Sequence, residues 1–446
     1  MQAHRMHQFL LLLGDLLLII GCLAFVFLLE DSKIYIASWS LSKVLLVCIS
    51  IPLITIMIFY ILGLYELSLP KRSEVILLYI CLGFSVIAVL YSALAYFVIA
   101  LRPGKINLLI IILMTGALTF LWHLCFQKVR EPNPQRLLFV GGEAIFDEMS
   151  DFIDKNFPKF YQVVGQLHGA KNPGGQAFSD FLKKNRVDQI VYSTHSELVR
   201  EIADDLLTIN FHNGNVIDAH NFYQQLTGKC PLYFIDNFWL LVNANKRLFT
   251  PVVTDKIKRG MDILVALVLL SLAWPILIII AIAVRLNSKG PVLFVQERLG
   301  QYETPFRVIK FRTMIDNAEK ATGPRWSTED DPRITRVGKI LRKLRLDELP
   351  QFFNVLKGEM SLVGPRPIRR HFANILAKDI PFYRLRFLAK PGLTGWAQVN
   401  HNYAGSNEGQ AEKQQFDLFY LIHQSLWLDL LILFKTVKIA IWAKGM

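Results

Sequence analysis

The sequence has little cysteine, and its cysteines point to no chemical role. Four of the five, Cys22, Cys48, Cys81 and Cys125, lie in apolar stretches, and Cys230 stands alone. This placement gives neither a metal-binding spacing nor a disulfide framework. The sequence also lacks a recognisable nucleic-acid-binding motif, and its most basic part is built around apolar runs. We therefore expect no nucleic-acid partner.

What the sequence does contain is apolar surface and positive charge. Of its 446 residues 53% are hydrophobic, the mean hydropathy is +0.35 and the net charge is +13. This profile is typical of a membrane protein with attached soluble parts. Most of the basic excess lies after residue 250. That part of the chain is therefore expected to face phosphates, acidic lipid or both.

Four apolar runs predict a transmembrane domain over residues 1–130. Each is long enough to cross about 30 Å of hydrocarbon as a helix; they lie near 9–29, 41–64, 75–101 and 106–126. The first lacks a clear signal-peptide cleavage site and is soon followed by another span. Cations such as Lys71 and Arg72 place both ends of this four-helix unit in the cytoplasm. Asp15 within the first run is either a functional acid or hydrogen-bonded inside the bundle.

Residues 131–250 are predicted to form a Rossmann-like α/β domain. Short strands alternate with amphipathic helical stretches, at 136–140, 161–165, 187–192 and 215–218. Gly141 and Gly142 follow the first strand, where a dinucleotide-binding loop begins. The spaced third glycine is missing, however, and Glu143 would repel a pyrophosphate. We therefore expect a degenerate nucleotide-binding fold that serves regulation or assembly, with nucleotide binding as the alternative.

The apolar run 261–284 is interrupted in its middle by Trp274-Pro275. Proline removes a helical hydrogen bond and clashes with the preceding turn, so a kink or break is expected at Pro275. Cations lie at both ends of the run, among them Lys256, Arg259, Arg285 and Lys289. The pattern predicts a re-entrant helix with both ends in the cytoplasm. The alternative is a kinked full span.

Two adjacent carboxylates occur beyond this run, in Arg345-Leu-Asp-Glu-Leu-Pro-Gln351. Pro350 suits the first position of a helix, where a missing N–H costs nothing. Asp347 and Glu348 would then lie where the helix dipole favours negative charge. An ionised carboxylate can attack phosphorus or hold a divalent cation. The alternative is that the pair only caps the helix.

Basic residues surround this pair in sequence, and we separate them into two groups. Runs such as Arg342-Lys-Leu-Arg345 are explained by a solvated or lipid-facing surface. Lys310, Arg312 and Arg366 stand instead in short mixed motifs, and Arg366 is fixed between two prolines. Arginine's planar fork suits bidentate contacts to phosphate. We therefore expect these three to bind phosphate.

Several motifs resemble those of the bacterial sugar transferase family, the monotopic polyprenyl-phosphate phosphoglycosyl transferases. They occur in the family's order and cover roughly residues 250–446: Lys310-Phe-Arg-Thr-Met314, Leu346-Asp-Glu-Leu-Pro-Gln351, Gly358-Glu-Met-Ser-Leu-Val-Gly-Pro-Arg-Pro367 and Pro391-Gly-Leu-Thr-Gly-Trp-Ala-Gln-Val399. The tail stretches Phe416-Asp-Leu-Phe-Tyr420 and Ser425-Leu-Trp-Leu-Asp-Leu430 fit too. One departure is Trp274-Pro275, where the family often has Ser-Pro. The proline that breaks the helix is retained.

The resemblance implies transfer of a sugar 1-phosphate from a UDP-sugar to undecaprenyl phosphate, with release of UMP. It implies Asp347 as the nucleophile of a covalent intermediate and Glu348 as the ligand of Mg²⁺. Substrate-binding residues would be Lys310, Arg312, Arg336, Arg345, Arg366 and Gln398. It further implies a multi-pass protein of the bacterial inner membrane, active on the cytoplasmic face in exopolysaccharide, capsule or O-antigen synthesis. Whether it forms a homo-oligomer is left open.

The predicted architecture has three parts. These are a membrane α-helical bundle (1–130), a Rossmann-like domain (131–250) and a mainly α-helical catalytic domain with a re-entrant helix (251–446). The final stretch, Ser425 to Lys444, is expected to form either an interfacial helix or a buried core helix. Two other readings of the whole chain are a transporter and a catalytically inactive scaffold that recruits other enzymes. The retained Asp347-Glu348 pair argues against the scaffold.

Overall fold

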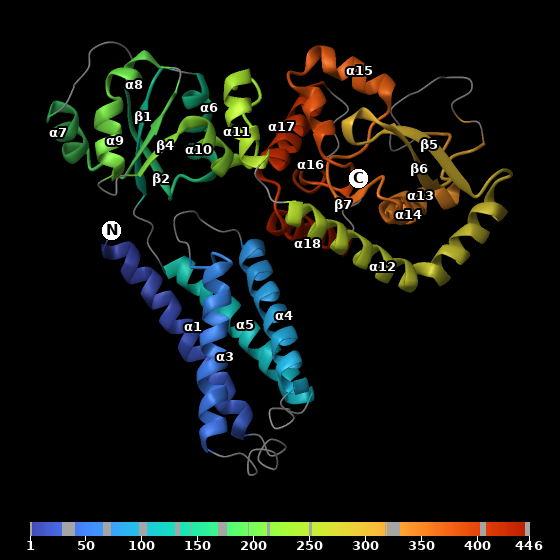
Figure 1. Cartoon of the computed structure of the whole chain (residues 1–446), viewed down its shortest axis with the longest axis horizontal. Helices are drawn as coiled ribbons and strands as arrows, with labels where there is room; N and C mark the ends of the chain where they lie inside the picture. The colour runs from blue at the N-terminus through green and yellow to red at the C-terminus, as the bar shows by residue number, and fades with distance from the viewer. Residues whose placement is uncertain are drawn as a thin grey trace. The chain divides into compact units, whose positions relative to one another are not determined.

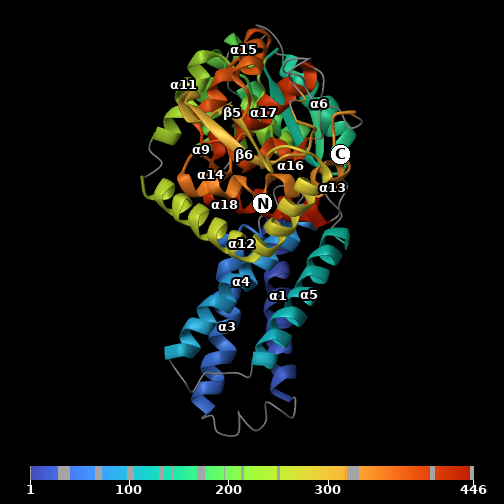
Figure 2. The ribbon, with the colours of Figure 1, turned by 90° about the vertical axis from the view of Figure 1, so that its right-hand side faces the viewer.

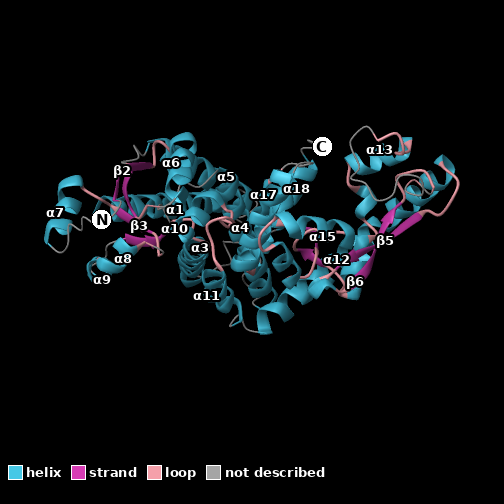
Figure 3. Ribbon diagram, turned by 90° about the horizontal axis from the view of Figure 1, so that it is seen from above, coloured by secondary structure: helices cyan, strands magenta, loops and turns pink. Residues whose placement is uncertain are grey.

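The computed structural model is mostly helical (Figures 1 and 3). It describes residues 2–28, 41–65, 73–97, 105–129, 134–142, 144–167, 176–194, 196–211, 215–248, 252–316, 318, 331–401 and 407–441. Its packing divides the chain into two compact units. One unit comprises residues 1–136 and 152–163, and the other comprises residues 137–151 and 164–446.

The N-terminal helices form where the sequence has its four apolar runs. They are α1 (Gln2–Leu28), α3 (Leu41–Ile61), α4 (Ser73–Phe97) and α5 (Lys105–Val129). Among described residues, Gln8–Phe25 and Ile110–Lys128 are long and apolar enough to cross a membrane. Ile49–Tyr60 and Ser73–Val89 are shorter apolar helices. Most of the loop cations used to predict orientation, including Lys71 and Arg72, lie outside the described residues.

Asp15 is fully buried within this bundle and is hydrogen-bonded there. Its Oδ2 accepts a hydrogen bond from the Tyr65 hydroxyl at 2.9 Å and lies 2.9 Å from His123 Nε2. Tyr65 follows α3, whereas His123 belongs to α5, so one carboxylate oxygen joins three helices. The structure thus supports the hydrogen-bonded alternative for Asp15.

Four short strands form a sheet in the order β2-β1-β3-β4. They are β1 (Gln135–Val140), β2 (Tyr161–Leu167), β3 (Gln189–Tyr192) and β4 (Asn215–Asp218), close to the predicted positions. β1 pairs with β3, and β3 with β4, in parallel. Figure 1 shows one group of helices on each side of the strands. The first group is α6 (Ala144–Asn156) and α10 (Ala219–Thr227), and the second is α7 (Gln176–Asn185), α8 (Glu197–Glu201) and α9 (Ala203–Phe211).

Gly141 lies close to other side chains at the end of β1. It has φ +125°, and a Cβ there would lie only 3.0 Å from the Cβ of Ser193. The Asp218 carboxylate accepts a hydrogen bond from the Asn221 N–H at the start of α10. Packing and helix capping explain these two features, and the degenerate nucleotide-binding site stays a prediction.

The longest helix, α12 (Val252–Asn287), carries Pro275 inside it and is not broken into two. The predicted interruption is a bend in a continuous helix, and Figures 1 and 2 show α12 curving along one side of the C-terminal part. Large apolar side chains remain exposed along it, including Leu272 (70%) and Ile279 (66%). Residues 254–287 form the third helix long enough to cross a membrane among the described residues.

The rest of the chain surrounds the concave side of α12 with short elements. They begin with the antiparallel pair β5 (Leu293–Leu299) and β6 (Pro305–Phe311), with the 3-10 turn η2 (Gln301–Glu303) between them. Then come α13 (Arg336–Lys343), the 3-10 turn η3 (Leu346–Glu348), α14 (Gln351–Lys357), β7 (Ser361–Val363), α15 (Arg370–Asp379) and the 3-10 segment η4 (Tyr383–Leu388). The last are β8 (Gly392–Thr394), α16 (Trp396–Asn400), α17 (Asn407–His423) and α18 (Leu426–Ile441).

The segment before α12 belongs to the core of this C-terminal part. Cys230, Leu232, Ile235 and Trp239, the last from α11 (Asn237–Leu248), share one apolar cluster with residues of α15, η4 and α17. Trp396 Nε1 also donates to the carbonyl of Gly228 at 2.8 Å. Packing therefore joins residues 228–239 to the C-terminal part, ahead of the division predicted near residue 250.

Candidate active site

The two adjacent carboxylates lie in a single 3-10 turn, η3, immediately before α14. Arg345, just before this turn, has φ +54°, a left-handed conformation that non-glycine residues rarely adopt. Pro350 is the N-cap of α14, not its first helical residue as predicted. The pair therefore precedes the helix and is held in a tight turn. Neither carboxylate caps α14.

Glu348 is paired with two cations. Its Oε1 lies 2.6 Å from Lys310 Nζ on β6 and 2.6 Å from Arg366 Nη2 on the loop after β7. Burial alone would raise the pKa of this carboxyl, but the charges of Arg366 and Lys310 outweigh it and the pKa falls below its ordinary value. Glu348 is therefore ionised at neutral pH. It brings the cationic side chains of Lys310 and Arg366 together at one carboxylate oxygen.

Asp347 differs from its neighbour in having no partner. It is buried (9% exposed), and no hydrogen bond or ion pair joins its carboxylate to another described residue. Burial and the adjacent charge of Glu348 raise the pKa of Asp347, and nearby cations only partly oppose this. A carboxylate that is unpaired, poorly solvated and close to positive charge is a reactive oxygen nucleophile.

The third cation near Asp347 is Arg342 of α13, which the sequence analysis assigned to a basic surface. Its charge lowers the pKa of Asp347 and partly opposes the effect of burial. Arg342 Nε donates to Thr313 Oγ1 at 2.9 Å. Within the run Arg342-Lys-Leu-Arg345, sequence alone gave no sign of which cation faces the site.

No contact of the described residues joins Arg312 to either carboxylate, and its role in binding substrate stays a prediction. Its Nη2 donates to the carbonyl and hydroxyl of Ser288, beyond the end of α12, at 2.8 and 2.9 Å. β6 ends at Phe311, so the side chains of Lys310 and Arg312 no longer follow one strand face. Arg336 and Arg345 are exposed, and Gln398 Nε2 donates to the carbonyl of Leu393. None of these three side chains contacts the carboxylate of Asp347 or Glu348 among the interactions of the described residues, although the Glu348 N–H donates to the Arg345 carbonyl at 3.4 Å.

A buried amide fixes the spacing between Lys310 and Glu348. Asn354 on α14 is fully buried; its Oδ1 accepts from the Ile309 N–H at 3.2 Å and its Nδ2 donates to the Arg307 carbonyl at 2.7 Å. These bonds satisfy main-chain groups on the edge of β6 next to Lys310. Because both sides of the amide are used, α14 cannot slide along β6 without leaving buried polar groups unpaired.

Two of the glycine-containing motifs meet backbone to backbone. A Cβ at Gly364 would overlap the carbonyl oxygen of Lys390, and one at Gly392 would overlap the Gly364 nitrogen. β7 and β8 pair in parallel here, and the Gly364 N–H donates to the Thr394 carbonyl at 2.9 Å. The close approach explains why glycine stands at both positions. It fixes the loop from which Arg366 reaches Glu348.

The site offers two carboxylates to a metal ion, which matches Mg²⁺ better than a metal that needs a full protein cage. Mg²⁺ is commonly held by one or two carboxylates together with substrate phosphates. Glu348 Oε2 has only a 3.5 Å contact with Arg366, so one oxygen remains available. Within the described ranges there is no group of three metal-ligating side chains. The residues present therefore fit a magnesium ion shared with a phosphorylated substrate.

Comparison with known proteins gives a consistent result. The bacterial sugar transferase family matches residues 253–443. A UDP-N-acetylgalactosamine-undecaprenyl-phosphate N-acetylgalactosaminephosphotransferase of Aeromonas hydrophila is 50% identical over 182 residues, 41% of this chain and 43% of the relative. A UDP-glucose:undecaprenyl-phosphate glucose-1-phosphate transferase of Escherichia coli (strain K12) is 34% identical over 330 residues, 68% of this chain and 67% of the relative.

A third relative carries a different sugar in its name. The UDP-galactose-lipid carrier transferase of Erwinia amylovora is 38% identical over 204 residues, 42% of this chain and 41% of its own length. The chain thus spans less than half of two of these three relatives, and about two thirds of the third.

Proposed function

The chain belongs to the bacterial sugar transferase family, and from this premise we propose that it transfers a sugar 1-phosphate from a UDP-sugar to undecaprenyl phosphate and releases UMP. The names of the relatives support a nucleotide sugar and a polyprenyl phosphate as substrates. The observation that carries the proposal is the contrast within η3. Asp347 is unpaired and buried, whereas Glu348 gathers Lys310 and Arg366 beside it.

The reaction that this geometry supports has two displacement steps. An Asp347 carboxylate oxygen attacks the β-phosphorus of the UDP-sugar, the bond to the bridging oxygen breaks, and UMP leaves. An oxygen of undecaprenyl phosphate then attacks the same phosphorus, which gives undecaprenyl diphosphate sugar and regenerates the carboxylate. Each step moves negative charge onto phosphate oxygens. Lys310, Arg342 and Arg366 lower the repulsion between an anionic nucleophile and an anionic substrate.

We propose that Glu348, with Asp347 close by, holds Mg²⁺ together with the diphosphate of the substrate. The ion supplies neutralisation of charge on the phosphoryl oxygens. When the diphosphate arrives, Lys310 and Arg366 can exchange part of their contact with Glu348 for phosphate oxygens. Their existing ion pairs with Glu348 keep both cations ready at the site before substrate binds.

The packing of α12 supports a site at the cytoplasmic membrane surface. A straight helix of its 36 residues would be about 54 Å long. Yet Arg259 near one end donates to carbonyls of α14, and Val284 near the other end is buried against the same C-terminal part. A full span would put these ends on opposite sides of the bilayer, away from a shared soluble core. We therefore propose a re-entrant helix in a multi-pass inner-membrane protein, with the four N-terminal helices as further spans.

Two observations disfavour an inactive scaffold as the alternative. A scaffold does not require an unpaired buried acid, which costs stability. It also does not require Lys310 and Arg366, from separate elements, on one carboxylate. We propose that the sheet domain serves regulation or assembly.

The direct test is to offer the purified full-length protein UDP-glucose, UDP-galactose and UDP-N-acetylgalactosamine, each with undecaprenyl phosphate and Mg²⁺, and to measure UMP. These are the three sugars in the relatives' names. We expect UMP and a lipid-linked diphosphate sugar from at least one donor. UDP-sugars that stay intact throughout, in a protein that is folded and membrane-inserted, would favour the scaffold.

A further inference from the structure

The loop that carries Arg366 is held by its main-chain carbonyls. Arg386 of η4 donates from Nη2 to the Arg366 carbonyl at 3.1 Å, and Arg298 of β5 donates from Nη1 to the Pro367 carbonyl at 2.6 Å. The Arg366 guanidinium itself points the other way, to Glu348, and its side chain is 42% exposed. The backbone of this loop is thus fixed while its one long side chain reaches the site.

Arg386 is in turn fixed by a buried acid from the C-terminal tail. Asp417 of α17 lies 2.9 Å from Arg386 Nη2, and the two side chains are 3% and 8% exposed. Arg386 Nη1 donates to the Tyr383 hydroxyl at 2.6 Å. A buried ion pair adds little net stability, because desolvation cancels much of its attraction. Because Arg386 also hydrogen-bonds the Arg366 carbonyl, the ion pair points to a role beyond stability.

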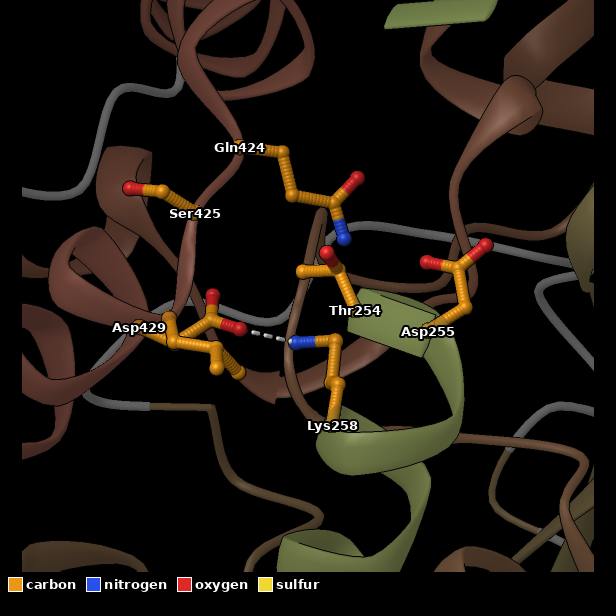
Figure 4. Close-up of a pocket in the computed structure, with 7 residues that line it drawn as sticks. Thr254, Asp255, Lys258, Gln424, Ser425 and Asp429 are labelled. Carbon is orange, nitrogen blue, oxygen red and sulfur yellow. Dashed lines mark hydrogen bonds and ion pairs between the residues drawn. The ribbon is translucent and has the colours of Figure 1, made fainter. Parts of the chain in front are cut away.

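A second buried acid of the tail holds the other end of the same loop. Asp429 of α18 lies 2.5 Å from Lys258 Nζ, at the start of α12, and accepts from the Tyr420 hydroxyl at 2.8 Å. Lys258 Nζ donates to the Val363 carbonyl at 3.1 Å, and the Tyr420 hydroxyl oxygen lies 3.2 Å from the same carbonyl oxygen. Figure 4 shows the Lys258–Asp429 pair with Thr254 and Gln424 beside it in a small polar pocket.

We propose that Asp417 and Asp429 are positioning residues for Arg366. Each holds a cation, Arg386 or Lys258, on a carbonyl of the Val363–Pro367 loop, and we call these two ion pairs the carbonyl brace. The inference rests on the proposed function, in which Arg366 exchanges Glu348 for the donor diphosphate. A fixed backbone keeps the guanidinium in position while it makes that exchange. Small misplacements of such a group reduce reaction rates by up to about a hundredfold.

The brace also gives a physical reason for the two tail motifs. Asp417 lies in Phe416-Asp-Leu-Phe-Tyr420 and Asp429 in Ser425-Leu-Trp-Leu-Asp-Leu430. Neither acid is joined to Asp347 or Glu348 by any contact of the described residues, so neither acts on the reacting atoms. The contacts of both acids lead to the loop that carries Arg366. A double-mutant cycle with Arg366 tests whether their effect passes through that side chain.

The experiment is a double-mutant cycle on the full-length protein. Asp417→Asn and Asp429→Asn keep the shape of each side chain and remove its charge. We expect each to lower kcat/KM for the UDP-sugar by about ten- to a hundredfold and to leave KM for undecaprenyl phosphate unchanged. In an Arg366→Lys background, the same substitutions should lower kcat/KM by less than about twofold. Equal fold-losses in both backgrounds would overturn the brace.

Two controls separate positioning from stability. Tyr383→Phe removes the hydroxyl next to Arg386 but leaves its bonds to Asp417 and Arg366, so kcat/KM should stay within about twofold of the parent. If an Asn variant does not fold, Tyr420→Phe tests the Val363 end by the same cycle. If the parent protein releases no UMP, the proposed function is wrong, and the carbonyl brace is wrong with it. If the parent is active but the Asn substitutions lower kcat/KM by the same factor in both backgrounds, only the carbonyl brace is wrong.

Discussion

Arg259 Nη1 lies 2.5 Å from the Val355 carbonyl oxygen, and its Nη2 lies 2.7 Å from that of Leu356. These carbonyls belong to the last turn of α14, where helical oxygens lack partners within the helix. The helix that follows the paired carboxylates is therefore capped by a side chain of α12. A displacement of α12 must be transmitted to α14, or these bonds must break.

Replacement of Asp347 by Asn removes the charge and the nucleophile but keeps the shape. We expect UMP release to fall by about three orders of magnitude or more. The raised pKa of Asp347 means that ionising it costs folding free energy, a cost that appears as pH rises from the ordinary aspartate pKa through the raised value. The variant lacks this cost, so its Tm at neutral pH should not be lower than the parent's.

Mass spectrometry of the parent with UDP-sugar alone should find a phosphosugar on the peptide that contains Asp347. UMP should appear before undecaprenyl phosphate is added, as ping-pong kinetics require. If no adduct forms and both substrates are needed together, transfer is a direct displacement and Asp347 has another role.

Replacement of Glu348 by Gln should act on both stability and magnesium use. The lowered pKa of Glu348 contributes stability that is present above the ordinary glutamate pKa and is lost as pH falls through the lowered value. We expect a loss of about 1–3 kcal/mol at neutral pH, reduced by the exposure of Arg366. This difference between variant and parent, measured by denaturant unfolding, should shrink in acid. Activity should fall and be partly restored by excess Mg²⁺; no change in the Mg²⁺ dependence would argue against Glu348 as a ligand.

Replacement of Gly364 by Ala should disrupt the site, since a Cβ there overlaps the Lys390 carbonyl. We expect a loss of about 2 kcal/mol or more in unfolding free energy, with a matching drop in UMP release. Gly260→Ala is the matched control: it lies in α12 with no atom within 4 Å of the added Cβ. That variant should be as stable as the parent or slightly more so. Equal tolerance of both substitutions would contradict the close approach of β7 and β8.

Cysteine labelling tests the re-entrant helix. Single cysteines at Lys256 and Lys289, both exposed in the structure, should react only with reagent on the cytoplasmic face. Pro275→Leu restores a helical hydrogen bond and should favour a straighter helix, so labelling at position 289 should shift partly to the opposite face. The native cysteines are replaced beforehand, so that only the introduced cysteine can react with the reagent. Labelling of 256 and 289 from opposite faces in the Pro275 parent would establish a full span.

Helices and strands could be predicted from the sequence where the local pattern of apolar and polar residues is clear. The strand runs around residues 138, 163, 190 and 216 are short, apolar and bounded by polar segments, and strands form at each. Lys310 and Arg366 were also identified, and the structure places both on Glu348. In these cases a residue's immediate neighbours decide its conformation.

Long-range contacts could not be predicted in this way. The Arg342 guanidinium bonds Thr313, which is far away in sequence, and its charge acts on the pKa of Asp347. Arg312 likewise bonds Ser288. Asp417 and Asp429 look like ordinary tail acids until their partners are known. Each of these assignments depends on which elements pack together.

The three-way contact at Asp15 has a consequence for how the N-terminal helices can turn. Successive residues of a helix point about 100° apart. Rotation of α1 by one residue would carry the carboxylate away from both Tyr65 and His123. The contact therefore works as a rotational lock, in which one oxygen sets the direction that α1 faces. A single-residue insertion between the buried Leu11 and Ile19 must turn one half of α1 against the other.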